Sequence, residues 1–298
     1  MSAETSAVAA RPRSSLNTAT VKHASLAEAV AAASRAGFAA VGLWRDQVQE
    51  TGPRTAARIV AEAGLRVSSL CRGGFLTADD DAGITAALDD NKRAVEEAAA
   101  VGTSELVMVL GGLPGSTPGG PPAPGADRGL VAARVRAADR LADLVPFAAA
   151  HGVRLALEPL HPLFAADRAV LSTLGQALDL AAPFPPSVVG VVIDTYHVWW
   201  DPELAAQVAR AGAEERISSY QVCDWALPLA PDALLSRRHV GDGYVDFAAV
   251  TRWVAAAGYR GDVETEIFNE DVWRADVDAT AATVLERYER HVEPHLGP

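Results

Sequence analysis

Short apolar segments alternate along the chain with longer, alanine-rich segments of helical period. The apolar segments lie at residues 16–22, 38–44, 66–71, 105–110, 153–158, 188–194, 216–223 and 261–267. The alanine-rich segments lie at residues 26–36, 54–64, 83–101, 129–151, 172–182, 203–211, 246–257 and 276–291. Apart from the weaker one at 16–22, the apolar segments are continuous rather than alternating, which is typical of parallel strands buried on both faces. The pattern predicts a series of consecutive β-α units.

Several of the predicted helices end on a glycine directly before the next strand. These residues are Gly37, Gly64, Gly102, Gly152 and Gly258, and glycine readily takes the left-handed conformation that ends a helix. Repeated units of this kind fit a (β/α)8 barrel, which usually takes about 250 residues. An open doubly wound sheet shares the local pattern but normally has a glycine-rich phosphate-binding turn after its first strand, and this sequence has none. We therefore predict an α/β protein with one domain, a (β/α)8 TIM barrel over residues 15–298.

Two segments fall outside the pattern. Residues 1–14 are rich in Ala and Ser without periodicity, and we predict a disordered N-terminal tail. Residues 113–129 are rich in Pro and Gly, which cannot support the interior of a helix or strand. We predict an extended loop there, which could serve as a lid or as a contact in a homo-oligomer.

Composition and charge narrow the function classes. The chain has 26 basic and 38 acidic residues, a formal net charge of −12, and no basic stripe of the kind that nucleic-acid-binding proteins show. No apolar run reaches the roughly 18 residues of a membrane span, and no signal peptide is evident. We expect a soluble, cytoplasmic protein with no nucleic-acid or membrane partner. Cys71 and Cys223 lack a CxxC spacing, and we expect both to be buried as small hydrophobic side chains.

Polar residues directly follow the fifth and sixth predicted strands. Chemistry in a (β/α)8 barrel lies at the C-terminal ends of the strands, so these positions are candidate site residues. Glu158 ends the fifth strand, and His161 either reaches the same cavity or lies on the surface. Asp194 ends the sixth strand and is followed by His197. Asp194 could be a helix N-cap, but together with His197 it favours a pocket.

The seventh and eighth predicted strands add further polar side chains. The seventh offers Gln221 and Asp224, and an inward-facing Gln221 is either an oxygen ligand or a core amide. On the eighth, Glu264 and Glu266 lie on the same face because strand residues alternate. Glu266 is nearer the C-terminal end and is the preferred candidate, with Glu264 as the alternative.

These strand ends would bring three carboxylates and one amide together at the barrel mouth. Carboxylates at such short distances raise one another's pKa unless a positive charge neutralises them. A divalent cation does so, and oxygen ligands favour Mn²⁺ or Mg²⁺ over zinc. The sequence therefore predicts one divalent metal ion.

Side chains outside the strand ends could contact a substrate. Arg237, Arg238 and His239 follow the seventh strand and could bind substrate oxygens or a phosphate, or be solvated loop residues. Three tryptophans could line a sugar ring or pack in the core: Trp44, Trp199 and Trp200.

The sequence resembles the sugar phosphate isomerase/epimerase superfamily, the xylose-isomerase-like TIM barrels that include ketose 3-epimerases, inosose dehydratases and endonuclease IV-type proteins. The resemblance covers about residues 16–291. It is carried by E-P-L-H-P at 158–162, D-T-Y-H at 194–197, Q-V-C-D at 221–224, G-D-G at 241–243 and E-T-E-I at 264–267. Endonuclease IV relatives carry many more histidine ligands, and this chain has only seven histidines.

The resemblance implies a ligand set and a chemistry. One metal ion would be held by Glu158, Asp194, Gln221 and Glu266, with Mn²⁺ foremost and Mg²⁺ or Co²⁺ as alternatives. Gln221 departs from the family, in which many members have His at this position. An amide oxygen is a harder metal ligand than an imidazole nitrogen. Glu158 and Glu266 would remove and return a proton from opposite faces of the carbon next to a carbonyl, while His197 binds a substrate oxygen.

We therefore expect a metal-dependent isomerase or epimerase of carbohydrate metabolism, acting on a small ketose-type sugar or cyclitol. If the enolate expelled a leaving group instead, the protein would be a lyase or dehydratase of an inosose or a 3-keto-glycoside. The alternative from another class is a non-catalytic sugar-binding barrel.

Overall fold

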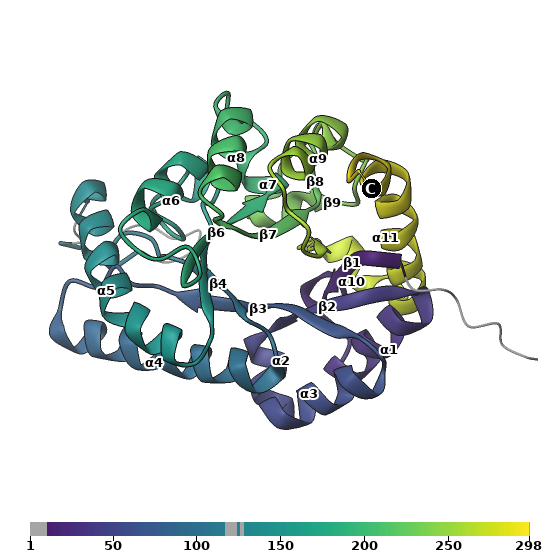
Figure 1. Ribbon diagram of the computed structural model, residues 1–298, viewed down its shortest axis with the longest axis horizontal. Helices are drawn as coiled ribbons and strands as arrows, with labels where there is room; N and C mark the ends of the chain where they lie inside the picture. The colour runs from purple at the N-terminus through teal and green to yellow at the C-terminus, as the bar shows by residue number, and fades with distance from the viewer. Residues whose placement is uncertain (1–10, 117–123, 126–127, 298) are drawn as a thin grey trace, which may run out of the picture.

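The computed structural model describes residues 11–116, 124–125 and 128–297, and its centre is a closed barrel of parallel strands (Figure 1). The strands follow one another around the barrel in chain order, and β10 pairs with β1 to close it. They are β1 (Arg11–Asn17), β2 (Phe38–Trp44), β3 (Arg66–Gly74), β4 (Glu105–Val109), β5 (Arg154–Leu157), β6 (Val189–Asp194), β7 (Ile217–Val222) and β10 (Val263–Thr265). The predicted (β/α)8 barrel is confirmed.

Helices surround the barrel. The longer ones are α1 (Leu26–Ala36), α3 (Pro53–Glu62), α4 (Asp81–Val101), α5 (Leu130–Ala150), α6 (Leu174–Ala181), α8 (Leu204–Ala213), α9 (Phe247–Ala256) and α11 (Val277–His291). Each matches a predicted helical segment to within a few residues. Local signals explain the accuracy: α1 begins at a capping box of Ser25 and Glu28 and ends at Gly37 with a φ of 98°.

Short elements after the strand ends were not predicted. The short helices α2 (Arg45–Thr51), α7 (Thr195–Val198) and α10 (Glu270–Arg274) follow β2, β6 and β10. A two-stranded antiparallel sheet of β8 (Asp224–Trp225) and β9 (Arg237–Arg238) lies beside β7. Short 3₁₀ helices are Thr18–Val21, Pro162–Phe164, Ala233–Ser236 and Glu293–His295. All are too short to show a period of their own.

The first strand lies earlier in the chain than predicted. β1 runs from Arg11 to Asn17, and Thr18–Val21 forms a 3₁₀ helix that the Asn17 side chain caps. Residues 11–14, assigned above to the tail, therefore belong to the barrel, while residues 1–10 lie outside the described part. The hydrophobic pattern misplaced this strand because its residues Ser14 and Ser15 are polar, although both are fully buried.

The Pro/Gly-rich segment predicted as a loop is partly described. Residues 113–116, 124–125 and 128–129 contain no helix or strand, and residues 117–123 and 126–127 lie outside the described part. Cys71 and Cys223 are buried free thiols, as expected. In the described part of the chain, no helix combines the length and the apolar character that crossing a bilayer requires.

Candidate metal and substrate site

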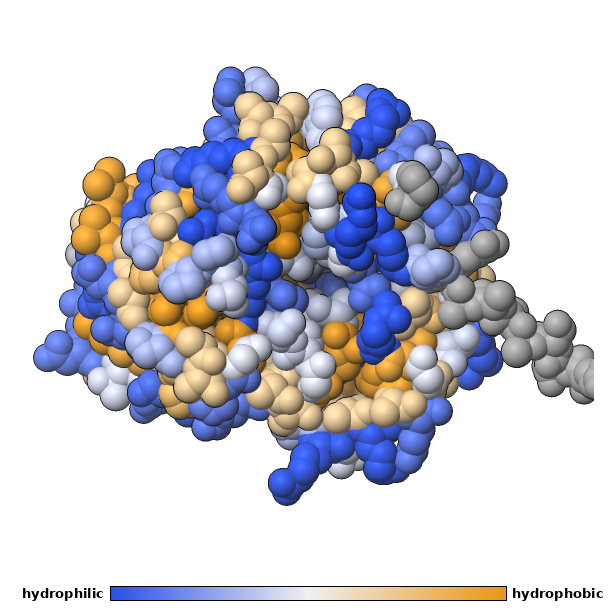
Figure 2. Space-filling model, in the orientation of Figure 1, coloured by the Kyte–Doolittle hydropathy of each residue, from blue (hydrophilic) through white to orange (hydrophobic). Residues whose placement is uncertain are grey.

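A cavity of about 300 Å³ opens at the C-terminal ends of the barrel strands, where the sequence placed the site. Figure 2 shows a hollow near the middle of one face of the molecule, with hydrophilic and hydrophobic residues beside it. Glu158, His197, Arg237 and Glu266 line the cavity together with apolar side chains of β3 and β4. The cavity therefore combines a charged group of side chains with an apolar wall.

Asp194 has both of the roles that the sequence left open, helix N-cap and site residue. It is the last residue of β6, and its Oδ1 accepts a hydrogen bond of 2.8 Å from Tyr196 N at the start of α7. Its Oδ2 lies 3.0 Å from Arg237 Nη1. The residue is thus both a helix cap and a member of the charged cluster.

Arg237, which was predicted from the sequence to bind the substrate, lies within the carboxylate cluster. Its Nη1 is 3.0 Å from Asp194 Oδ2 and 3.1 Å from Glu266 Oε2, and its Nη2 is 2.9 Å from His197 Nε2. The guanidinium is also stacked over the rings of Tyr196 and Phe268. It is almost fully buried, so its first role in this conformation is to neutralise carboxylates.

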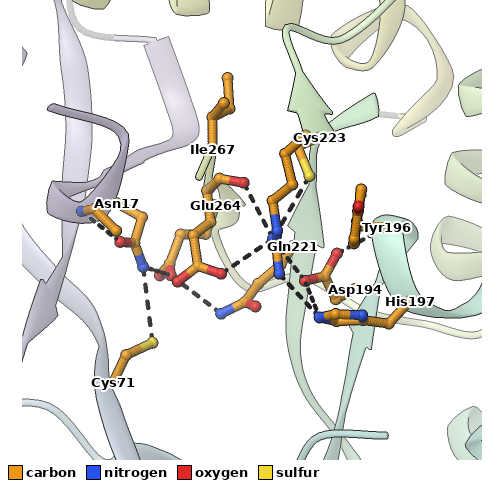
Figure 3. A network of polar contacts seen from close by, with 12 residues as sticks. Asn17, Cys71, Asp194, Tyr196, His197, Gln221, Cys223, Glu264 and Ile267 are labelled. Carbon is orange, nitrogen blue, oxygen red and sulfur yellow. Dashed lines mark hydrogen bonds and ion pairs between the residues drawn. The ribbon is translucent and has the colours of Figure 1, made fainter. Parts of the chain in front are cut away.

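Hydrogen-bond partners distinguish Glu264 from Glu266. Glu264 accepts hydrogen bonds from Asn17 and Gln221 at Oε1 and from Ser68 and Ser69 at Oε2; Figure 3 shows Asn17 and Gln221 beside it. All four donors are neutral side chains of the barrel interior.

Glu266 lies two residues nearer the mouth and lines the cavity. Trp44 Nε1 donates to its Oε1 at 3.1 Å, and Arg237 pairs with its Oε2. These placements favour Glu266 as the site residue, which was the preferred candidate from the sequence.

Gln221 lies level with both Asp194 and Glu264 in the strand register. Its Nε2 donates to Glu264 Oε1 at 3.1 Å, while its Oε1 is buried and has no hydrogen-bond partner among the described residues. A buried carbonyl oxygen without a partner is costly. Gln221 is therefore partly a core amide and partly an oxygen that a ligand could satisfy.

Burial and mutual repulsion perturb the protonation of the cluster. Burial, followed by the charges of Asp194 and Glu266, raises the pKa of Glu158 well above its ordinary value. Burial also raises the pKa of Glu266 to about 7, against the lowering effect of Arg237. Burial, aided by the charge of Arg237, keeps the pKa of His197 well below its ordinary value. The single positive charge of Arg237 thus does not suffice to keep all three carboxylates ionised near neutral pH, and a further cation would favour their charged form.

The residues fit a divalent metal ion. Glu158, Asp194 and His197 each offer a ligand atom, and these atoms lie within 4.8 Å of one another. The His197 Nδ1 accepts a hydrogen bond from His161 N, and its Nε2 lies 4.0 Å from Glu158 Oε1 and 3.8 Å from Asp194 Oδ2. The carboxylates of Glu158 and Asp194, together with the predicted ligands Gln221 and Glu266, would give an oxygen-rich donor set typical of hard cations.

Several predicted substrate residues lie behind the cavity wall rather than on it. The ring of His161 stacks on Trp225 with centroids 4.6 Å apart, and Trp200 Nε1 donates to His197 O. Neither His161 nor Trp200 is among the described residues that line the cavity. Both support His197 from behind, whereas Trp44 does line the cavity.

Asp224 and His239 also lie away from the cavity. Asp224 accepts four backbone hydrogen bonds, from Trp225, Gly241, Gly243 and Val245. Its oxygens therefore hold the G-D-G turn and are not free for a substrate, which corrects the sequence prediction. His239 lies near Asp242 and Arg287 and is absent from the described cavity lining.

The sequence reasoning missed cavity residues that follow the earlier strands. Arg72 near the end of β3, Lys22 after β1, and Phe75 all line the cavity. Arg72 follows an apolar run, the same signal that identified Glu158 and Asp194. Reading every strand end, rather than the last four, would have found it.

Comparisons with known proteins agree with this geometry. The sequence family described as xylose isomerase-like TIM barrel matches residues 30–288. The chain belongs to this family. This xylose isomerase-like barrel is similar to protein SMc04130 from Sinorhizobium meliloti 1021, with 45% identity, a TM-score of 0.88, and coverage of 94% of this chain and 98% of that chain.

Two enzymes are among the proteins similar to this xylose isomerase-like barrel. It is 34% identical over 155 residues to a 3-dehydroshikimate dehydratase of Pseudomonas aeruginosa, a match that covers 50% of this chain but only 23% of the dehydratase. The structure of an L-ribulose 3-epimerase has a TM-score of 0.74 at 19% identity, covering 96% of each chain, which shows a shared fold alone. The family and the dehydratase match support an enzyme, without separating an isomerase from a lyase.

Proposed function

We propose that the protein is a metal-dependent isomerase or epimerase that moves a proton at the carbon next to a carbonyl of a small sugar- or cyclitol-derived ketone. The observation that carries the proposal is the pair of buried carboxylates, Glu158 and Glu266, that line one cavity. They extend from β5 and β10, which β6 and β7 separate around the barrel. Two carboxylates that approach a substrate from different sides can act as base and acid in turn.

The other residues of the cavity hold the substrate. His197 presents its Nε2 to the cavity and would bind a substrate oxygen. Trp44 and Phe268 are in edge-to-face contact at 5.3 Å and form an apolar side of the cavity, suited to the carbon face of a ring. Glu158, Asp194, Glu266 and the Gln221 oxygen would hold a divalent ion, with Mn²⁺ foremost and Mg²⁺ or Co²⁺ as alternatives. When bound, such an ion stabilises negative charge that develops on a carbonyl oxygen.

A dehydratase is the second candidate, favoured by the 34% identity to a 3-dehydroshikimate dehydratase. The two activities share the first step, in which a carboxylate removes the proton. They differ in whether the proton returns to carbon or a neighbouring hydroxyl leaves as water.

Proton exchange in D₂O tests the shared step and separates its outcomes. We expect deuterium to enter at the carbon next to the carbonyl of ketoses, inososes or 3-keto-glycosides. NMR spectroscopy measures this incorporation. A new isomer indicates an epimerase or isomerase, and loss of water with a new alkene signal indicates a dehydratase. Glu158→Gln and Glu266→Gln should each slow exchange by about 100-fold or more, whereas Glu62→Gln on the exposed face of α3 should not. Absence of exchange with all three substrate classes would favour the non-catalytic sugar-binding barrel.

A further inference from the structure

The β3 side of the cavity carries a positive charge. Arg72 lies near the end of β3, which β4 and β5 separate from the Asp194 strand β6. Arg72 lines the same cavity as Glu158 and Glu266. A substrate in the cavity would therefore meet acidic groups toward β5 and β10 and a guanidinium at β3.

Aromatic rings hold the Arg72 guanidinium in place. Its Cζ lies 4.2 Å from the centre of the Phe75 ring and 5.9 Å from that of Trp44. These cation–π contacts orient the group without neutralising its charge. Nearby Lys22, over the ring of Trp273 at 5.0 Å, adds a second positive charge at the rim.

Arg72 has no carboxylate partner among the described residues, unlike the neighbouring arginines. Arg45 pairs with Asp90 and Glu97, and Arg168 pairs with Asp232. Arg72 is half-buried, and burial lowers its pKa although the charges of Glu158 and Glu266 act in the opposite direction. An unpaired, partly buried arginine that faces a cavity is suited to receive an anionic ligand.

The backbone beside Arg72 is held in an uncommon conformation. Phe75 has a φ of 57°, in the left-handed region that bulky residues rarely adopt. Hydrogen bonds from Phe75 N to Val109 O and from Gly74 N to Asn91 Oδ1 maintain it. Strain of this kind concentrates at ligand sites, and here it places the Phe75 ring, 43% exposed, under the guanidinium.

We propose that the substrate carries a carboxylate, which Arg72 binds on the β3 side of the cavity, while the reacting carbonyl lies toward Glu158 and Glu266. Only the position of the reacting carbonyl rests on the proposed function. A carboxylate matches the planar guanidinium with two parallel hydrogen bonds. A phosphate usually recruits backbone N–H groups of a helix N-terminus or a glycine-rich turn as well, whereas Arg72 and Lys22 supply side-chain donors. The acidic cluster repels the anionic end, so the two ends of the substrate are distinguished.

Calorimetric titration with three probes tests the assignment. The probes are a trihydroxycyclohexanecarboxylate, its neutral carboxamide and inorganic phosphate. Each is titrated into the protein as purified and again after dialysis against EDTA, so that a bound metal ion cannot act as the carboxylate receptor. The variants are Arg72→Met, which keeps the apolar stem, Arg72→Lys, which keeps the charge, and the control Arg252→Met on the exposed face of α9.

We expect the wild-type protein to bind the carboxylate at least about tenfold more tightly than the carboxamide. Arg72→Met should bring that ratio to about one, Arg72→Lys should give an intermediate ratio, and Arg252→Met should retain the wild-type ratio. If Arg72→Met does not fold, Arg72→Gln replaces it with the same expectation.

A wild-type ratio near one would overturn the proposal, and so would a ratio that survives removal of Arg72. Arg72-dependent binding of phosphate with no preference for the carboxylate would overturn it in favour of a phosphorylated substrate. The titrations need no turnover, so failure of proton exchange with every ketone would defeat the proposed function and leave the Arg72 assignment standing.

Discussion

Glu264 and Glu266 lie two residues apart on one strand face, yet their surroundings give them different roles. Glu264 receives hydrogen bonds from neutral side chains of β1, β3 and β7. Space for it exists only because β2 has Gly42 opposite, where an added Cβ would lie 2.4 Å from Glu264 Cδ. Glu266 faces the cavity and Arg237. The first carboxylate therefore holds strands together, and the second is available for chemistry.

Amide substitutions should separate these roles. Glu264→Gln would turn an NH₂ group toward side chains that now donate, and a buried donor left without an acceptor costs about 1–3 kcal/mol. We expect its free energy of unfolding to fall by about 2–4 kcal/mol in urea denaturation, and Glu266→Gln to change it by less while slowing proton exchange more. Equal losses of stability in the two variants would contradict the distinction, with Glu62→Gln as the surface control.

At the scale of elements, the small β8–β9 sheet decides where Arg237 lies. Trp225 pairs with Arg237 across this sheet, and Asp224 anchors its base through four backbone hydrogen bonds to the turn at residues 241–245. Gly243 is required there, because an added Cβ would lie 2.1 Å from Trp225 O. The turn thus positions the cavity arginine although it contributes nothing to the cavity itself.

Asp224→Asn should weaken this anchor. The amide keeps one acceptor and presents its NH₂ group to two backbone donors, so we expect a loss of about 2–4 kcal/mol in the free energy of unfolding and weaker substrate binding through a displaced Arg237. Asp246→Asn is the matched control, since Asp246 is an exposed N-cap of α9 and asparagine caps a helix equally well. A stable Asp224→Asn protein would argue that the turn holds without its carboxylate.

For the whole molecule, barrel closure brings like charges together. Glu158, Asp194 and Glu266 come from positions far apart in the chain, and Arg237 pairs with only two of them, Asp194 and Glu266. Folding therefore brings together carboxylates that repel one another and raises the pKa of Glu158. A bound cation should stabilise the fold because it binds the native state alone.

Removal of metal should lower the thermal stability. We expect dialysis against EDTA to lower the Tm by several degrees and Mn²⁺ or Mg²⁺ to restore it, since a ligand at about 100 times its Kd contributes about 2.7 kcal/mol. Scanning calorimetry measures the Tm, and elemental analysis measures the metal content. In the Glu158→Gln variant, the Tm should no longer respond to metal. A metal-free protein whose Tm does not respond to added metal would exclude the ion from this site.

The local pattern was sufficient for the helices and for most strands. Capping residues and glycines such as Ser25 and Gly37 act within a few residues of chain, so their effect is visible in the sequence. β1 was misplaced because its buried serines find their partners on strands distant in sequence, as when Ser15 contacts Ser68. A polar residue whose partner is remote carries no local signal of burial.

The sequence by itself determined the alternating β-α order and the acidic residues at the strand ends, because strand burial and helix termination depend on near neighbours. Only the tertiary structure decided that Glu264 is held by four neutral donors, that Asp224 anchors a turn, that Arg237 enters the carboxylate cluster, and that Arg72 is left without an acid. These roles depend on distances between side chains from different strands and loops. Such distances are fixed when the barrel closes.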